Sequence, residues 1–284
     1  MILIDLSQVM IANLMQQIGN HQNAQVDESM LRHMILNTLR HNRKKFRNDF
    51  GEIVICADDK HSWRKGPFPY YKANRKKSRE ESEMDWDSIF NSLSKIREEI
   101  KEHMPYKVIQ VSGAEADDII GTIVHRKGTQ LNTGEQILIL SGDKDFVQLH
   151  QYGNVRQYSP TLKAWVSNND PEEYLYQHIL KGDKGDGIPN VMMPDNFLVA
   201  GEGRQKCITK KRIDMWRKEE DRDDTIKRNF RRNQHIIDLT ETPHNIQEQI
   251  MEDLDKDPIG KRSDIMNYFM ENRLKMLMEH LTDF

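Results

Sequence analysis

The sequence predicts an α/β fold, in which helices flank a central and mostly parallel sheet and a smaller helical part follows toward the C-terminus. Short apolar runs of strand length recur along the first half of the chain, and segments with helical spacing of apolar residues separate them. A helix between two strands normally makes the strands parallel members of one sheet. The four runs are Ile2–Ile4, Ile53–Ala57, Val108–Val111 and Ile137–Leu140.

Two helical segments connect these runs. Residues 28–46 repeat apolar side chains at helical spacing and carry a basic outer face. Residues 114–125 also repeat apolar side chains at helical spacing, with Ile119, Ile120 and Ile123 on one side. The stretch 108–146 is therefore predicted to run strand, helix, loop, strand.

The second half of the chain is predicted to add two edge strands and then helices. Val155–Tyr158 and Ala164–Val166 are expected to form strands around a turn at Pro160. Asp170 and Pro171 are typical of a helix N-cap and first helical residue, so a helix is expected over 171–181. Further helices are expected at 246–256 and, as one continuous helix, at 264–281.

Composition narrows the class of protein without identifying it. The chain has 284 residues, a net charge of −3 and two cysteines, which predict neither a disulfide framework nor a zinc site. The first eighteen residues include Asp5 and no basic leader, so a signal peptide is not expected. No apolar run reaches the length of a membrane span. An intracellular monomer that does not bind membranes is the expectation.

Acidic residues follow each of the four apolar runs. A single acid at a strand end is often a helix cap or turn residue, but four strand ends that share this feature favour a common site. Carboxylates that converge on one sheet edge repel one another unless a cation lies between them, and oxygen ligands suit Mg²⁺ or Mn²⁺ rather than Zn²⁺. The acids are Asp5, Asp58, Glu115, Asp117, Asp118, Asp143 and Asp145.

Two further segments have compositions that suggest function. Residues 181–191 hold Asp183 and Asp186 in a Gly-rich turn, which is either an ordinary loop with Asx turns or an extension of the metal site. Residues 60–79 hold eight Lys/Arg and no acid, with aromatic residues between them. This pattern is either a solvated surface or a segment that binds single-stranded nucleic acid. Residues 204–232 hold twelve Lys/Arg against six Asp/Glu, which suits either a duplex contact or a solvated helix.

Five motifs in order, ILIDLS, VICADD, EADD, SGDKDF and KGDKGDGIPNV, resemble the 5′ nucleases of the flap endonuclease family. WRKGPFPYYKANRKKSREES is similar to the phage-type members, the ribonucleases H of T-even-type bacteriophages. The resemblance covers nearly the whole chain and implies a PIN-like 5′ nuclease core. It also implies two Mg²⁺ ions, with Mn²⁺ as a substitute, and a K⁺ ion at the duplex-binding element.

The resemblance implies a role for each acid. The first metal site takes Asp5, Asp58, Asp117 and Asp143, with Glu115 acting through water, and the second draws on Asp118, Asp145, Asp183 and Asp186. Lys72 and Arg64 match residues that the family places over the scissile phosphate, so the expected catalytic residues are Lys72, Arg64, Asp117 and Asp143. None of the eleven histidines has metal-ligand spacing.

The resemblance also implies how nucleic acid is bound. An α/β core is expected over 1–181, with an arch for the 5′ single strand at about 60–88, and a helical C-terminal domain over 182–284. A helix–hairpin–helix-like element is expected at about 182–215, although MMPDNFLVAGEGRQK departs there from the family pattern. The expected nucleic-acid contacts are Arg64, Lys65, Tyr71, Lys72, Arg75, Lys76, Lys77, Lys210, Lys211 and Arg212.

The implied function is a metal-dependent 5′→3′ exonuclease and flap endonuclease that removes RNA primers and adjacent DNA from lagging-strand fragments during phage replication. Its expected substrates are branched, flapped or nicked DNA and RNA–DNA duplex. Its expected protein partners are a phage single-strand-binding protein and a sliding clamp, and its expected location is the host cytoplasm. Two alternatives are a non-catalytic binder of branched DNA and a metal-dependent phosphatase for small molecules. The basic run 60–79 argues against the phosphatase.

Overall fold

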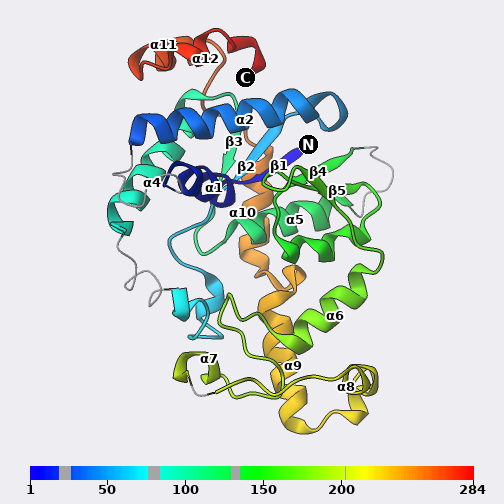
Figure 1. Cartoon of the computed structure of the whole chain (residues 1–284). Helices are drawn as coiled ribbons and strands as arrows, with labels where there is room; N and C mark the ends of the chain where they lie inside the picture. The colour runs from blue at the N-terminus through cyan, green and yellow to red at the C-terminus, as the bar shows by residue number, and fades with distance from the viewer. Residues whose placement is uncertain (19–26, 76–83, 129–134, 202) are drawn as a thin grey trace.

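One six-stranded sheet organises the protein (Figure 1). The computed structural model describes residues 1–18, 27–75, 84–128, 135–201 and 203–284. The strand order is β3-β2-β1-β4-β5-β6, with β1 to β5 parallel to their neighbours and β6 antiparallel at the edge. The predicted fold class is confirmed. The strands are β1 (Ile2–Asp5), β2 (Ile53–Cys56), β3 (Lys107–Ile109), β4 (Ile137–Leu140), β5 (Val155–Ser159) and β6 (Ala164–Val166).

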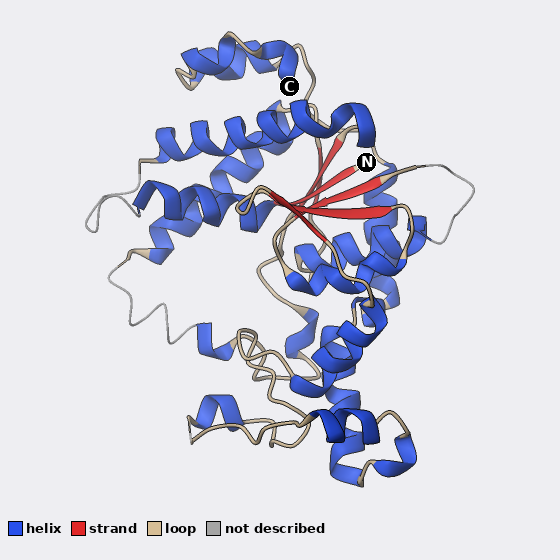
Figure 2. Ribbon diagram, turned by 45° about the vertical axis from the view of Figure 1, so that its right-hand side comes forward, coloured by secondary structure: helices blue, strands red, loops and turns tan. Residues whose placement is uncertain are grey.

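Helices cover both faces of the twisted sheet (Figure 2). Helices α1, α2 and α4 bury their apolar sides with Ile2 and Ile4 of β1, whereas α5 and α10 pack on the face that carries Leu3. The described helices are α1 (Leu6–Ile18), α2 (Glu28–Phe50), α4 (Trp86–His103), α5 (Ala116–Gly128), α6 (Pro171–Lys181), α7 (Phe197–Ala200), α8 (Lys210–Met215), α9 (Asp224–Ile237), α10 (His244–Asp255), α11 (Ile265–Glu271) and α12 (Lys275–Met278). No helix among these is both long and apolar enough to cross a membrane.

The strand register places the acidic chain segments at one edge of the sheet. Asp5 pairs with Cys56 across β1 and β2, and Ile4 pairs with Leu140 across β1 and β4. Because the strands are parallel and in register, the segments that leave β1, β2 and β4 all begin at the carboxyl edge. The four-residue strands β1, β2 and β4 are buried throughout, as expected for a parallel sheet covered on both faces.

The C-terminal helices share the hydrophobic cores of the sheet. Helix α10 packs against α5, and Ile265, Phe269 and Phe284 join the core that contains α2 and α4. The expected boundary after residue 181 therefore stays a prediction, since the helical part contributes to both faces of the α/β core.

The expectation of one helix over 264–281 was wrong. Helix α11 ends at Glu271, Arg273 adopts a left-handed φ of 56°, and α12 begins only at Lys275. A left-handed residue cannot continue a right-handed helix. The backbone N–H of Leu274 turns back to the carbonyl of Phe269 at 2.8 Å, and this turn directs the following chain into the core.

The first part of the basic run is packed rather than free. Phe68 and Tyr71 are 1% and 3% exposed, and they form a small core with Ile179 of α6, Ile188 and Ile236 of α9. This packing holds the start of the expected arch against α6 and α9. Residues 76–83 lie outside the described residues.

Candidate active site

Asp5 lies at the end of β1, at the centre of the carboxyl edge. It is 8% exposed and accepts a hydrogen bond from the backbone N–H of Gln8, in the first turn of α1, at 3.0 Å. Burial, together with the negative charges of Asp58 and Asp143, raises the pKa of Asp5 to about 7. Three predicted ligands from three strand ends are thus brought together.

The two acids that follow β2 have different partners. Asp58 accepts the backbone N–H of Ala116 at 2.7 Å, so it joins β2 to the first residue of α5. Asp59 instead accepts the backbone N–H of Gly113 at 2.9 Å. Asp58 faces Asp5, whereas Asp59 holds the loop between β3 and α5.

The start of α5 supplies Glu115 and Asp117. Burial and the charges of Asp5, Asp143 and Asp145 raise the pKa of Asp117 well above its ordinary value. A carboxylate so placed is costly without a cation, and this cost is consistent with a metal site.

Glu115 has cationic neighbours instead. Its carboxylate accepts the Tyr71 hydroxyl at 2.6 Å and the Lys72 Nζ at 2.7 Å. Burial alone would raise the pKa of Glu115, but the charges of Lys72 and Arg64 lower it. Glu115 is therefore ionised, and it orients the side chains of Tyr71 and Lys72.

Asp118, which the resemblance makes a ligand of the second ion, has protein donors at both of its carboxylate oxygens. It is fully buried, and its Oδ2 accepts Arg64 Nη1 at 2.8 Å and the backbone N–H of Glu115 at 2.8 Å. Its Oδ1 accepts Trp63 Nε1 at 3.1 Å and the Thr242 hydroxyl at 2.9 Å. Four donors occupy this carboxylate, so it holds α5, the segment 63–64 and residue 242 together.

Arg64 is buried beside Asp118. It is 3% exposed, and its Nε donates to the carbonyl of Ile236 in α9 at 2.8 Å. Arg64 also lines the small pocket that Asp117, Asp145 and Asp186 share, so the contact with the scissile phosphate that the resemblance implies stays a prediction. Its position makes it a structural partner of the site.

A second group of acids lies in the segment after β4 and in the loop after α6. Asp143 caps the 3₁₀ helix Lys144–Gln151 and accepts the backbone N–H of Asp145 at 3.0 Å. Burial and the charges of Asp143, Asp183 and Asp186 raise the pKa of Asp145 to about 7. In the loop, Asp183 Oδ1 accepts the backbone N–H of Asp186 at 3.0 Å.

Residues 71–75 of the basic run contact the loop after α6. The Lys72 backbone N–H donates to the carbonyl of Asp186 at 2.8 Å, and Lys72 has a left-handed φ of 56°. Arg75 forms an ion pair with Asp186, and the Tyr71 hydroxyl lies 3.1 Å from the same carboxylate. Tyr71 is therefore a buried positioning residue, which corrects its expected contact with nucleic acid.

The remaining predicted nucleic-acid residues lie elsewhere or outside the described residues. Lys65 is exposed, whereas Lys76 and Lys77 fall in the segment that the structure does not describe. Lys210, Lys211 and Arg212 are exposed on α8, at the end of the molecule far from α2 (Figure 1). Within 187–215 the described helices α7 and α8 have four and six residues.

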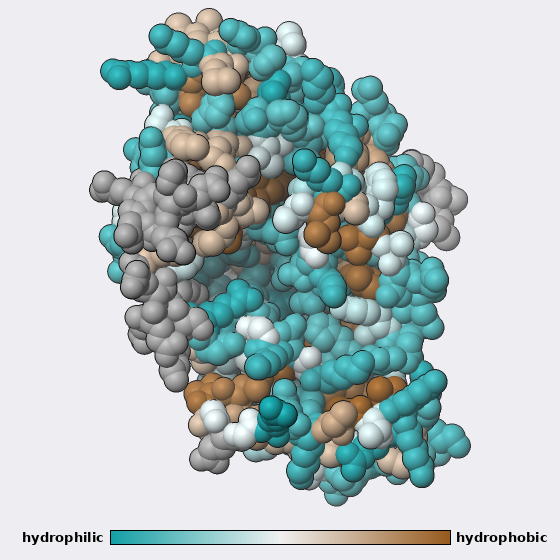
Figure 3. Space-filling view, in the orientation of Figure 1, coloured by the Kyte–Doolittle hydropathy of each residue, from teal (hydrophilic) through white to brown (hydrophobic). Residues whose placement is uncertain are grey.

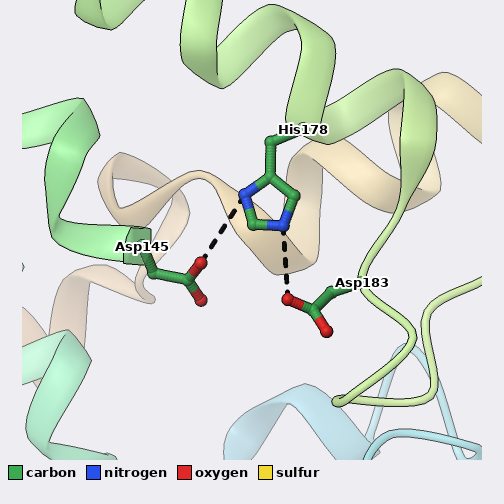
Figure 4. A group of neighbouring side chains, drawn as sticks. All are labelled: Asp145, His178 and Asp183. Carbon is green, nitrogen blue, oxygen red and sulfur yellow. Dashed lines mark hydrogen bonds and ion pairs between the residues drawn. The ribbon is translucent and has the colours of Figure 1, made fainter. Parts of the chain in front are cut away.

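Sequence reasoning missed His178. It lies on α6, with Nε2 3.3 Å from Asp183 and Nδ1 3.6 Å from Asp145 (Figure 4). One donor atom from each of these three residues lies within 4.8 Å of the others. The available signal was its place in the last turn of a helix that leads directly into the acidic loop.

The donor set fits divalent cations. Carboxylate oxygens gather from β1, the segments after β2 and β4, α5 and the loop after α6, and burial together with repulsion raises the pKa of Asp5, Asp117 and Asp145. Asp117, Asp145, Asp183 and Asp186 line one small pocket with Tyr71. Figure 3 shows that this face of the molecule is hollowed at mid-height and mostly hydrophilic there.

Comparison with known families agrees with this geometry. Residues 1–178 match the family described as 5′-3′ exonuclease, N-terminal resolvase-like domain. Residues 170–284 match the family described as T4 RNase H, C terminal.

Two individual proteins with similar sequences are also nucleases. Ribonuclease H of Enterobacteria phage T4 is 33% identical over 99% of this chain and 95% of its own. The flap endonuclease Xni of Shewanella pealeana is 29% identical over 54% of this chain and 50% of its own.

Among solved structures, the D15 flap endonuclease of bacteriophage T5, in a pseudo-enzyme-product complex with DNA and metal ions, superposes with a TM-score of 0.64. The two sequences are 16% identical over 89% of this chain and 97% of the other, so this similarity supports the fold alone. The resemblance seen in the sequence motifs is confirmed. The chain therefore belongs to the 5′-3′ exonuclease family, a family of metal-dependent nucleases that cleave phosphodiester bonds, and it matches the ribonuclease H of bacteriophage T4 over nearly its whole length.

Proposed function

We propose that this protein uses two divalent ions, Mg²⁺ with Mn²⁺ as a substitute, to cleave nucleic acid from the 5′ end and at flaps. In the cell it would remove RNA primers and the adjacent DNA from lagging-strand fragments during phage replication, in the host cytoplasm and as a monomer. The observation that supports this most directly is the convergence of acids from five chain segments, where burial and mutual repulsion raise the pKa of Asp5 and Asp145 to about 7.

The proposed ligands form two neighbouring groups. Asp5, Asp58, Asp117 and Asp143 would hold one ion, and Asp143, Asp145, Asp183 and Asp186 would hold the other, directly or through water. We leave Asp118 out of both groups because Arg64 and three further donors already occupy its oxygens. When bound, such ions lower the pKa of water and offset charge on the phosphate during in-line displacement.

The chain's own residues would position the substrate. The Lys72 amine lies beside the acids, 2.7 Å from Glu115 and 3.7 Å from Asp186. Although burial opposes it, the charges of Asp186 and Glu115 raise the pKa of Lys72, so it remains protonated at neutral pH. A protonated amine there is placed to offset charge on a phosphoryl oxygen, and Glu115 holds it in position.

Cationic side chains of the basic run and of α8 would guide the nucleic acid toward the acids. Lys65, Lys72, Arg75, Lys76 and Lys77 would contact the 5′ single strand, and Lys210, Lys211 and Arg212 on α8 would contact the duplex backbone. Phosphate contacts position a substrate without reading its sequence, which suits an enzyme that acts on branched, flapped, nicked and RNA–DNA duplexes. The family resemblance further supports a K⁺ ion near 187–215 and, as partners, a single-strand-binding protein and a sliding clamp.

The test is cleavage of a 5′-labelled flapped duplex, with Mg²⁺ or with EDTA, by the wild type and Asp117→Asn. We expect the variant to bind the duplex with affinity close to that of the wild type, while its rate falls by about 10²-fold or more. Asp59→Asn is the matched control, because Asp59 is also a strand-end acid but bonds to Gly113. It should cleave at nearly the wild-type rate.

The alternatives predict different outcomes. Duplex binding with no cleavage by the wild type in Mg²⁺ would support the branched-DNA binder. Equal rates on a nucleoside monophosphate and on the flapped duplex would support the phosphatase. Cleavage by Asp117→Asn at the wild-type rate would remove the proposed ligand set.

A further inference from the structure

We propose that the Nδ1 atom of His178 is a nitrogen ligand for a divalent ion held with Asp145, that Asp183 orients the ring through Nε2, and that this nitrogen makes the position favour Mn²⁺ over Mg²⁺. The inference rests on the proposed metal-dependent function. It adds a ligand of a different chemical kind to a site that otherwise offers carboxylate oxygens in the described part of the chain.

The surroundings of His178 hold its ring in place. The side chain is 12% exposed, and the Tyr174 ring lies edge-on with the centroids 5.9 Å apart. On the other side, Asp183 is fixed by the loop, because its carbonyl accepts the Ile188 N–H at 2.7 Å and its carboxylate accepts the Asp186 N–H at 3.0 Å. The imidazole is therefore directed at the acids and is not a freely moving surface group.

The two ring nitrogens have different partners (Figure 4). Nε2 lies 3.3 Å from Asp183 Oδ2, within hydrogen-bond distance, so a proton on Nε2 would be donated to that carboxylate. Nδ1 is buried and makes no hydrogen bond within the described residues, although Asp145 Oδ1 lies 3.6 Å from it. This arrangement is common for metal-binding histidines, in which the second nitrogen donates to a carboxylate.

The gap between Nδ1 and Asp145 Oδ1 suits a positive charge. With the proton on Nε2, the Nδ1 lone pair faces a carboxylate, which is repulsive unless a proton or a metal ion lies between them. Asp143 and Asp186 add to the negative charge around Asp145. A divalent ion offsets more of this charge than a single proton does. Two donors about 2.1 Å from one ion are separated by roughly 3–3.6 Å, which matches the observed spacing.

The nitrogen donor has a consequence for the choice of ion. Mg²⁺ prefers oxygen ligands and keeps several waters, whereas imidazole nitrogen suits first-row transition ions. The group around Asp5, Asp58 and Asp117 offers oxygens alone among the described residues. Mn²⁺ should therefore be favoured at the His178 side of the site and not at the Asp5 side.

The experiment measures the metal bond directly and does not depend on cleavage. Pulsed EPR of the full chain loaded with Mn²⁺ should show coupling to a histidine nitrogen, and this coupling should change when the protein is labelled with ¹⁵N-histidine. In His178→Gln the coupling should disappear, and calorimetric titration should show Mn²⁺ affinity falling by about 10-fold while Mg²⁺ affinity changes little. His235→Gln is the matched control, because His235 pairs with Glu241 away from the acids.

Each outcome decides the proposal. Absence of histidine coupling in the wild type overturns it, as does equal loss of Mn²⁺ and Mg²⁺ affinity in His178→Gln. The labelled wild type needs no substitution, so a variant that fails to fold does not prevent the decision. A wild type that binds Mn²⁺ through nitrogen but does not cleave the flapped duplex would contradict the proposed function and leave this inference standing.

Discussion

Replacing Asp118 by Asn should destabilise the fold, whereas the same change at the adjacent Asp117 should not. The Asp118 carboxylate is fully buried and accepts four hydrogen bonds, including the ion pair with Arg64 at 2.8 Å. An amide has nearly the same shape but carries no charge, and its NH₂ group would face donors. Arg64, at 3% exposure, would keep only Glu115 at 3.3 Å as an ionic partner.

The expected magnitude follows from that geometry. Removing one partner of a buried ion pair costs about 3–5 kcal/mol, because the other charge stays buried. For a protein of this size the loss corresponds to a fall in Tm of roughly 6–15 °C. Asp117→Asn should leave the Tm in EDTA unchanged or higher, because burial and the charges of Asp5 and Asp143 already raise the pKa of Asp117.

The assay is thermal and urea unfolding of both variants in EDTA, with calorimetric titration of Mg²⁺. We expect Asp118→Asn to lose stability, and Asp117→Asn to keep stability and lose Mg²⁺ affinity. If Asp118→Asn were as stable as the wild type and bound Mg²⁺ weakly, Asp118 would be a ligand and the buried ion pair would not be structural.

Three further predictions concern the pH dependence, the loop and the C-terminus. Because burial and Asp58 raise the pKa of Asp5 from 3.8 to about 7, the stability that Asp5 contributes is fully present below pH 3.8 and is lost as the pH rises through 7. Between pH 5 and pH 8 in EDTA, the free energy of unfolding should therefore fall less for Asp5→Asn than for the wild type. An equal fall with pH in both proteins would contradict this. Gly187→Ala should slow cleavage, because Gly187 has a φ of +75° and a Cβ there would lie 2.9 Å from the Tyr70 carbonyl oxygen. Gly201→Ala is the control, because Gly201 has a φ of +71° but no atom near the position of a Cβ. If both variants slowed cleavage equally, the close contact with Tyr70 would not be the cause. Phe284→Ala should lower the free energy of unfolding in urea by about 3–5 kcal/mol, because the ring is fully buried and its centroid lies 5.2 Å from that of Phe269. A changed cleavage rate well below the Tm would count against a purely structural role for Phe284.

The sequence by itself determined the sheet and the order of its acids. β4 has the predicted bounds, the helix over 171–181 begins at the predicted cap Asp170, and the acids after β1, β2 and β4 lie at one edge. These features were predictable because apolar runs, caps and the parallel crossover are local or follow from general rules of chain connection. The motif set also identified the family.

Only the tertiary structure decided which side chains face the site. Asp117 and Asp118 are adjacent in the sequence, but neighbouring positions of a helix point about 100° apart, and one faces the acids while the other meets Arg64 and Thr242. The side chains that bond to Asp118 come from segments more than fifty residues away in either direction. His178 likewise acquires its role from Asp145, which lies on another element. Side-chain direction depends on what packs against an element, and distant parts of the chain supply that packing.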